Sequence, residues 1–395
     1  MELRQWDRLF LKCLLLCAAG IVVAAVLGLD LLTSYLFMAT FPLTVILWGR
    51  SVRKTLTAMD LLMMLTATLA VISVIINVWI AGGALYFDYF RKLIMFIMTL
   101  MFFQTAYRLR VDREIVRFMD RIVDLLTIFL VVMYILQPMQ AHMLNGRLTR
   151  YLTFGFNNPN TTGLFLTCLF MMEMYRLFKK EKWYMKTLHI LMACVLIWFV
   201  VETQSRNCLL VLAMFVAVCI WLRFRSTRAL QITRFWSVVI AWFPLLFALL
   251  YMLFIYSPWI QNALSFIVDV GKELDSRTKI WTIALENIRQ SPLIGDYFGI
   301  SNGTGNSQLH NSHLDIMASY GIPILVMVCT ALSTYLYQKG RIYEDKQSYI
   351  YILAFTCAIM LGIGEAALFS GGLGIYIFVG AFLMLSNAKS EEEEV

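Results

Sequence analysis

The chain has 395 residues, of which 60% are hydrophobic and only 15% are charged. A soluble domain needs a more polar surface, so this composition excludes one and indicates a polytopic membrane protein. The net charge of +8 could suggest nucleic-acid binding, but the basic residues are distributed as membrane topology requires. The eight cysteines lie in or beside apolar segments without metal-ligand spacing, and we expect them to be buried hydrophobic residues.

Apolar runs long enough to cross a bilayer recur along the whole chain. We expect an all-α fold with about twelve transmembrane helices, forming a single membrane domain over residues 1–395. The predicted spans are residues 9–28, 31–48, 59–80, 88–107, 121–137, 161–178, 184–201, 207–222, 236–256, 310–337, 348–365 and 371–387. Two outer connections are long, 138–160 and 257–309, and the second is expected to be partly helical. The first run has no small-residue cleavage site, so we expect no cleaved signal peptide.

The distribution of Lys and Arg predicts the orientation. With the N-terminus in the cytoplasm, 24 of the 33 basic residues fall on cytoplasmic segments, as the positive-inside rule requires. Both termini are then cytoplasmic, and the acidic tail, 388–395, is a solvated end. The other nine basic residues fall on the outer face: Arg91, Lys92, Arg147, Arg150, Arg206, Lys272, Arg277, Lys279 and Arg289.

Arg206 follows Glu202 in a very short outer turn between two apolar segments. A cation at this depth is costly unless it reaches the interface, pairs with an acid or faces a cavity. The alternatives are therefore a snorkelling or Glu202-paired arginine and an anion clamp.

Arg277 opens a segment, 277–290, whose pattern predicts an amphipathic helix. We expect Asp275 or Ser276 to cap it and Ser291-Pro292 to end it. Arg277 precedes Trp281 by four residues, so it shares the apolar face that should lie on the membrane domain. A cation at a helix N-terminus is poorly placed against the helix dipole, and a bound anion would explain it. The alternative is a solvent-exposed residue in a frayed first turn.

His310 and His313 stand one helical turn apart where the glycine-rich run 301–309 meets an apolar segment. Beside two outer arginines, they suggest an acid/base group that faces an anionic substrate. Asn311 and Asp315 form a second i,i+4 pair on a neighbouring face. A metal site at the two histidines is the alternative, although no third outer ligand is evident.

Two further places can contribute to such a site. Asn158-Pro159-Asn160 begins a predicted helix, whose free N–H groups could bind an anion or sugar hydroxyls or simply be capped. Glu365, at the outer end of span 348–365, could orient a histidine or an arginine or only mark a helix end. The run Gly303-Thr304-Gly305-Asn306 is either a phosphate-binding nest or a flexible hinge.

Several of these motifs together resemble the O-antigen ligase/Wzy-type polymerase family. They are Thr203-Gln204-Ser205-Arg206, the Arg277–Trp281 helix with Ser291-Pro292-Leu293-Ile294-Gly295, His310-Asn311 followed by Gly321, and Asn158-Pro159-Asn160. The resemblance covers most of residues 150–335 and implies a membrane glycosyltransferase of the GT-C type in the bacterial cytoplasmic (inner) membrane.

The resemblance also implies roles for particular residues. Arg206 and Arg277 would hold the diphosphate of an undecaprenyl-diphosphate-linked oligosaccharide, and His310 would be the catalytic base. His313, Asn311, Asn160, Asp315 and Glu365 would support them. No cofactor or metal is expected, because the diphosphate is already a leaving group, and no nucleic-acid partner is expected. Membrane lipid and other polysaccharide-assembly proteins are the further partners.

The sequence favours a polymerase over a ligase within this family. Ligases of the family tend to have Gly, Thr or Tyr three residues after the glycine that Gly321 matches, and this chain has Ile324. His313 stands where members often carry an aromatic residue. We therefore expect a capsule or O-antigen polymerase. Ligase-type transfer to another acceptor, and a transporter or flippase of lipid-linked sugars, are the alternatives.

Overall fold

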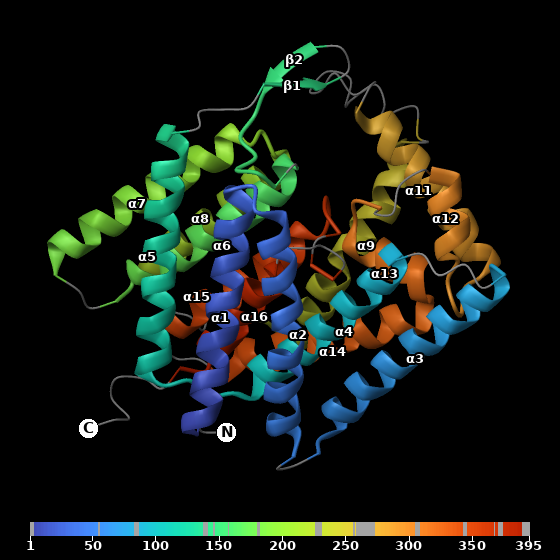
Figure 1. Cartoon of the computed structure of the whole chain (residues 1–395), viewed down its shortest axis with the longest axis horizontal. Coiled ribbons are helices and arrows are strands. Elements are labelled where there is room, and N and C mark those ends of the chain that lie inside the picture. The colour runs from blue at the N-terminus through green and yellow to red at the C-terminus, as the bar shows by residue number, and fades with distance from the viewer. Residues whose placement is uncertain are drawn as a thin grey trace.

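The computed structural model describes residues 4–53, 56–82, 87–136, 141–144, 147–156, 158–179, 182–225, 231–255, 257, 273–304, 309–342, 346–366, 368–369 and 374–388. Within them the chain is helical apart from one two-stranded hairpin (Figure 1). The elements are α1 (Gln5–Val26), α2 (Asp30–Val52), α3 (Ala58–Ile80), α4 (Phe87–Arg108), α5 (Arg113–Leu136), β1 (Ala141–Leu144), β2 (Arg147–Arg150), α6 (Pro159–Arg176), α7 (Trp183–Glu202), α8 (Arg206–Phe224), α9 (Arg234–Ile255), α11 (Glu273–Gln290), α12 (Tyr297–Thr304), α13 (Ser312–Tyr320), α14 (Ile322–Ile342), α15 (Lys346–Leu361) and α16 (Ile375–Leu385).

Six helices of the described chain are long and apolar enough to cross a membrane: α1, α2, α3, α7, α8 and α9. This agrees with a polytopic membrane protein but does not reach the predicted number of about twelve. The start of α1 lies at one edge of the molecule, and the hairpin and α11 lie at the opposite edge (Figure 1). The tail, 389–395, lies outside the described residues.

The centre of the bundle is formed by helices that are buried nearly all round. All residues of α16 are buried, and so are most of those of α6. Such continuous burial explains why their sequences are apolar on every face rather than on one stripe. Gly380 of α16 allows α4 to come close, because a Cβ there would lie 2.5 Å from the Phe102 ring.

The predicted span 310–337 is wrong as a single helix, because Gly321 divides it into α13 and α14. Gly321 has a φ of 96°, which side chains rarely adopt, and a Cβ there would lie 2.2 Å from the Leu293 carbonyl oxygen. A Cβ at Gly295 would likewise lie 2.5 Å from the Ala318 carbonyl oxygen. The Pro292–Gly295 turn and the α13–α14 joint therefore pack backbone against backbone, and α13 is wholly buried.

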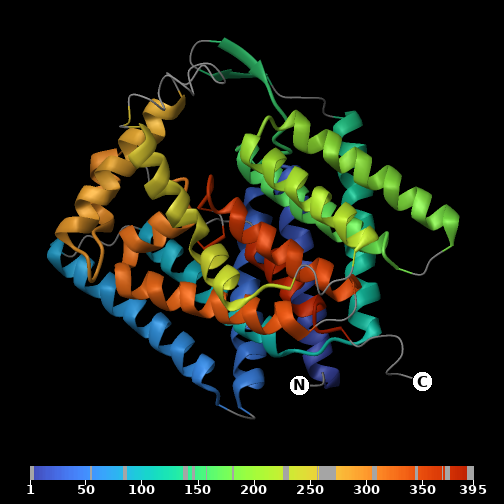
Figure 2. The same cartoon turned by 180° about the vertical axis from the view of Figure 1, so that it is seen from behind.

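The described part of the long connection 257–309 contains two helices, α11 and α12, which Figures 1 and 2 show from opposite sides. The amphipathic pattern of α11 is confirmed, since Trp281 and Ala284 are buried while Lys279 and Arg289 are exposed. The predicted cap is wrong, because α11 begins at Glu273 and residues 275 and 276 lie inside it. The hairpin β1–β2, paired antiparallel from Ala141↔Arg150, occupies the other long connection, which the sequence had not indicated as strand.

The fourth predicted span, 88–107, coincides with helix α4, and its charged residues stand at the start of that helix. The helix α4 begins at Phe87, so Asp88, Arg91 and Lys92 all lie within its first turns. Lys92 is buried, with 7% of its surface exposed.

Candidate functional site

Asn311 caps α13 and ties it to two other parts of the chain. Its Oδ1 accepts hydrogen bonds from the backbone N–H groups of His313 (3.1 Å) and Leu314 (3.0 Å). Asparagine is a preferred N-cap because its oxygen satisfies N–H groups that lack helical partners. Its Nδ2 donates to the carbonyls of Pro244 (2.9 Å) and Ile363 (3.3 Å). Asn311 is therefore the junction between α13, α9 and the turn that follows α15.

His310 stands immediately before this cap, at the N-terminus of the buried helix α13. Its φ is 51°, in the left-handed region that few non-glycine residues adopt. Its side chain is 31% exposed, while Asn311 and His313 are fully buried. The site therefore has one histidine that solvent or substrate can reach.

Glu365 is an acidic residue close to the His310 ring. Its Oε1 lies 3.6 Å from His310 Nδ1, which is beyond hydrogen-bond length, and its side chain is 3% exposed. Among the described residues, neither of these two buried atoms has a hydrogen-bond partner. Buried polar atoms without partners cost roughly 1–3 kcal/mol each, and they are uncommon in native proteins. The pair can therefore tighten, or accept one further polar group.

His313 is bonded at both ring nitrogens. Nε2 lies 2.6 Å from the Ala241 carbonyl oxygen, so it carries the proton, and Nδ1 lies 3.1 Å from Ser312 Oγ. Ala241 stands one turn before Pro244 in α9, where the proline interrupts the helical hydrogen bonds. His313 thus fastens α13 to the bend of α9 and presents no free nitrogen to a substrate.

Asp315 forms a buried ion pair with Lys92 of α4. The Lys92 Nζ to Asp315 Oδ1 distance is 2.7 Å, and both side chains are under a tenth exposed. The same Oδ1 accepts the backbone N–H of Leu309 at 3.4 Å. Asp315 is therefore occupied by protein partners. Sequence reasoning had missed the pair, although a lysine inside an apolar span is a signal for a buried partner.

The turn 361–366 carries Glu365 and is held from two sides. Ser312 N donates to the Gly362 carbonyl (2.9 Å), and Asn207 Nδ2 donates to the Leu361 carbonyl (2.8 Å). A Cβ at Gly364 would lie 3.0 Å from Asn207 Nδ2, so this turn packs tightly on the start of α8. The structure thereby joins Glu365 to the Thr203–Asn207 turn, a link with no signal in the sequence.

Arg206 is the first residue of α8 and is exposed. In the turn before Arg206, Gln204 adopts the left-handed backbone conformation, with a φ of 57°. Its neighbour Asn207 is bonded to the Glu365 turn, so Arg206 stands beside that turn at the positive end of a helix. An anion held there would be favoured by both the guanidinium and the helix dipole.

Arg277 lies in the second turn of α11 and is half-buried. It is not at the helix N-terminus as predicted, since α11 begins four residues earlier. One turn on, Trp281 is 1% exposed and donates from Nε1 to the Leu309 carbonyl (2.8 Å). The Trp281 ring also packs edge-on against Tyr251 of α9, at 5.2 Å. Arg277 is thus anchored, through its helix, to the residue before His310.

Asn160 is the second residue of α6, behind an ordinary cap. Asn158 Oδ1 accepts the Asn160 N–H at 2.9 Å, and Pro159 takes the first helical position. Gly163, one turn on, would bring a Cβ within 3.1 Å of Thr203 Oγ1 and Ser205 Cβ. The start of α6 therefore packs against the turn that carries Arg206, and it does not touch His310 through any described contact.

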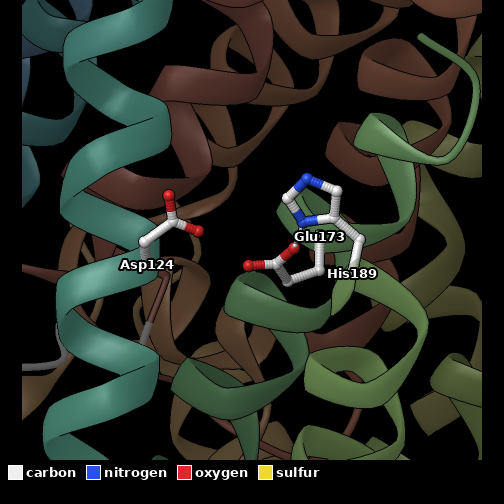
Figure 3. Close-up of side chains that lie close together, drawn as sticks. All are labelled: Asp124, Glu173 and His189. Carbon is white, nitrogen blue, oxygen red and sulfur yellow. Dashed lines mark hydrogen bonds and ion pairs between the residues drawn. The ribbon is translucent and has the colours of Figure 1, made fainter. Parts of the chain in front are cut away.

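A second cluster of titratable residues lies away from this site. Asp124 of α5, Glu173 of α6 and His189 of α7 bring their ligand atoms within 4.8 Å of one another (Figure 3). His189 Nδ1 lies 3.0 Å from Glu173 Oε2, but Arg176 Nη1 contacts both Glu173 (3.2 Å) and Asp124. The guanidinium supplies the positive charge that a metal would supply, so the cluster is a buried salt-bridge network.

One comparison with known proteins bears on this arrangement. Residues 190–329 match the family described as O-Antigen ligase, which confirms the resemblance drawn from the motifs. The matched segment runs from α7 into α14, so it includes Arg206, Arg277 and His310 and excludes Glu365, Asn160 and Lys92. A search of the curated proteins finds no match.

Proposed function

We propose that this chain, a member of the O-antigen ligase/Wzy-type family by its residues 190–329, polymerises undecaprenyl-diphosphate-linked oligosaccharide repeat units. It would be a GT-C-type glycosyltransferase that passes the growing glycan to an acceptor hydroxyl on the outer face of the bacterial inner membrane. The observation that carries the proposal is the His310–Glu365 pair. A reachable imidazole stands 3.6 Å from a buried carboxylate, and neither atom has a hydrogen-bond partner among the described residues.

In this reaction His310 is the general base. The acceptor hydroxyl gives its proton to the ring nitrogen of His310 while its oxygen attacks the anomeric carbon of the donor sugar. The bond from that carbon to the diphosphate breaks, and undecaprenyl diphosphate leaves with the electron pair. Attack opposite the leaving group inverts the anomeric configuration. Glu365 stabilises the imidazolium that forms, as a carboxylate does in other histidine–carboxylate pairs.

Arg206 and Arg277 hold the diphosphate in the proposal. Negative charge grows on the leaving group as the bond breaks, and guanidinium forks stabilise it bidentately. Arg206 adds the positive end of α8. These fixed charges replace the metal that other sugar transferases use at this step, so the proposal involves neither a cofactor nor a metal.

The alternatives share the family but differ in acceptor or outcome. A ligase would transfer the glycan once to a different acceptor, and a transporter would move the lipid without forming a glycosidic bond. Ile324 is fully packed beneath the α13–α14 joint, with 2% of its surface exposed, where ligases tend to have Gly, Thr or Tyr. That departure supports a polymerase.

Reconstitution tests the proposal directly. Purified protein in vesicles receives its lipid-linked repeat unit, and a ladder of polymer is the expected product. A His310→Ala variant is the negative control and should form no ladder. A single transfer that occurs only with another acceptor would indicate a ligase. Movement of the lipid without any new glycosidic bond would indicate a transporter.

The orientation is tested separately. Gly303 is exposed in α12, and the 24-to-9 distribution of basic residues puts it outside the cytoplasm. A Gly303→Cys variant should react with an impermeant thiol reagent added to the outer side of intact cells. Labelling only from the cytoplasmic side would overturn both the topology and the proposed site.

A further inference from the structure

We propose that Trp281 and the Lys92–Asp315 ion pair are positioning residues, which clamp the backbone of Leu309 and so direct the His310 ring at Glu365. The inference deepens the proposed function and rests on it for one of its two readouts. The residues involved come from α11 and α13, in the C-terminal third of the chain, and from α4, in the N-terminal third.

The clamp holds both polar groups of Leu309. The Leu309 carbonyl accepts from Trp281 Nε1 at 2.8 Å, and its N–H donates to Asp315 Oδ1 at 3.4 Å. Lys92 Nζ lies 2.7 Å from that same oxygen. Leu309, Trp281 and Asp315 are each no more than 2% exposed, so water does not compete for these bonds.

His310 needs such support because of its backbone. Its φ of 51° is a conformation that relaxes readily if the flanking residues are free. Asn311 fixes the following side through the cap of α13. The clamp on Leu309 fixes the preceding side. With both neighbouring residues held, the backbone of His310 is fixed in the conformation that places its ring beside Glu365.

A buried ion pair costs desolvation free energy that apolar core residues do not, so we expect the Lys92–Asp315 pair to have a role beyond filling space. Apolar residues of similar volume often stabilise a fold as well as a buried pair does or better. The Lys92–Asp315 pair borders a small pocket, lined also by Tyr297, Ser301 and Leu309. What the pair adds over apolar packing is an acceptor for the Leu309 N–H. A carboxylate pinned by Lys92 provides that acceptor at a fixed position.

The clamp also couples the two ends of the site. Trp281 stands one turn from Arg277 on α11, so a shift of α11 moves the Arg277 backbone and the Leu309 carbonyl together. The donor-binding arginine and the base are therefore set by one helix.

Two variants test the clamp without leaving a buried charge. Trp281→Phe keeps an aromatic ring against Tyr251 and removes the N–H donor together with part of the buried ring volume. Lys92→Met/Asp315→Leu removes the acceptor of the Leu309 N–H and replaces the whole ion pair. Trp198→Phe is the matched control, because it removes an indole N–H bond, to Tyr134 (3.4 Å), from an exposed part of α7.

The first readout does not depend on glycan transfer. Diethyl pyrocarbonate modifies accessible neutral imidazoles, and peptide mass spectrometry gives the rate at His310 alone. We expect each clamp variant to change that rate at pH 7 by roughly threefold or more, the scale of one lost hydrogen bond. The second readout is polymer formation, where kcat should fall roughly threefold to tenfold with KM for the lipid-linked donor unchanged. Trp198→Phe should leave both at the wild-type value.

The outcomes separate the clamp from the proposed function. If both variants fold and neither changes the His310 rate, the clamp is wrong, whatever happens to activity. A raised KM for the lipid-linked donor with an unchanged kcat would also overturn the clamp, since that pattern is expected when a residue contacts the donor. If the His310 rate changes as expected while wild-type protein forms no polymer, the clamp stands and the proposed function fails.

Discussion

Glu365 Oε1 lies 3.6 Å from Nδ1 of His310, and within the part of the chain described by the structure each atom lacks any hydrogen-bond partner. The carboxylate is buried in the turn that follows α15, and the imidazole is partly exposed just before the cap of α13. The two helix ends meet because Ser312 and Asn311 bond to the carbonyls of Gly362 and Ile363.

Glu365→Gln keeps the shape of this pair and removes its charge. We expect polymer formation to fall at least about tenfold, because the imidazolium formed on proton transfer loses its counter-charge. The measurement is the initial rate with purified lipid-linked repeat unit. Glu286→Gln, which alters an exposed carboxylate on α11, is the control and should behave as wild type. An unchanged rate in Glu365→Gln would remove Glu365 from the mechanism.

The two histidines should respond differently to truncation. His310→Ala should lower the rate by about 10²–10⁴, the usual contribution of a general base, while lipid-linked single units accumulate. His313→Ala should lower the melting temperature, because it leaves a buried cavity and breaks the bonds to Ala241 and Ser312. The folded fraction of His313→Ala should keep activity within about tenfold of wild type. Loss of the chemical step in His313→Ala at an unchanged melting temperature would contradict this assignment.

Arginine-to-lysine changes test the two predicted diphosphate ligands. Arg206→Lys and Arg277→Lys keep the charge but lose the planar fork, so each should lower polymer formation at a normal protein level. Arg289→Lys is the control, since Arg289 is exposed and pairs only with Glu286 of its own helix among the contacts described. Each variant is assayed over a range of donor concentrations. Normal polymer from either lysine variant would show that protein carboxylates, or nothing, engage that arginine.

Gly321 should tolerate no side chain. In Gly321→Ala the methyl group would meet the Leu293 carbonyl oxygen at 2.2 Å in a backbone conformation that alanine disfavours. We expect the variant to lose about 2 kcal/mol or more of stability, which a thermal melt in detergent would detect. Gly49→Ala lies inside α2 with open space around it and should melt at or above the wild-type temperature. Equal melting temperatures for the two variants would mean that the α13–α14 joint is not as tight as described.

The Asp124–Glu173–His189 cluster should depend on Arg176 and not on a metal. Arg176→Met leaves the buried Glu173 carboxylate without its cation and should cost about 3–5 kcal/mol of stability. Arg289→Met, at an exposed pair, is the control and should melt close to the wild-type temperature. A chelator should leave the wild-type melting temperature unchanged. A drop on chelation would show that a metal ion shares the cluster.

The sequence by itself determined the class of protein and the approximate positions of its helices. Hydropathy gives these directly, because an apolar run must be buried in lipid or in protein wherever it lies. The motifs around Arg206, Arg277 and His310 were also sufficient to indicate the resemblance to the O-antigen ligase family, which residues 190–329 match. The amphipathic face of α11 followed from its periodicity.

The tertiary structure alone decided which of the singled-out residues meet. His310 and Glu365 come together across 55 residues through backbone bonds that no local pattern records. His313 and Asp315 were predicted as supporting residues, and the structure alone shows that their partners are Ala241 and Lys92. The break at Gly321 likewise depends on the Leu293 carbonyl, which arrives from another turn. Periodicity reports which face of a segment is buried, whereas the choice of buried partner depends on how distant elements pack.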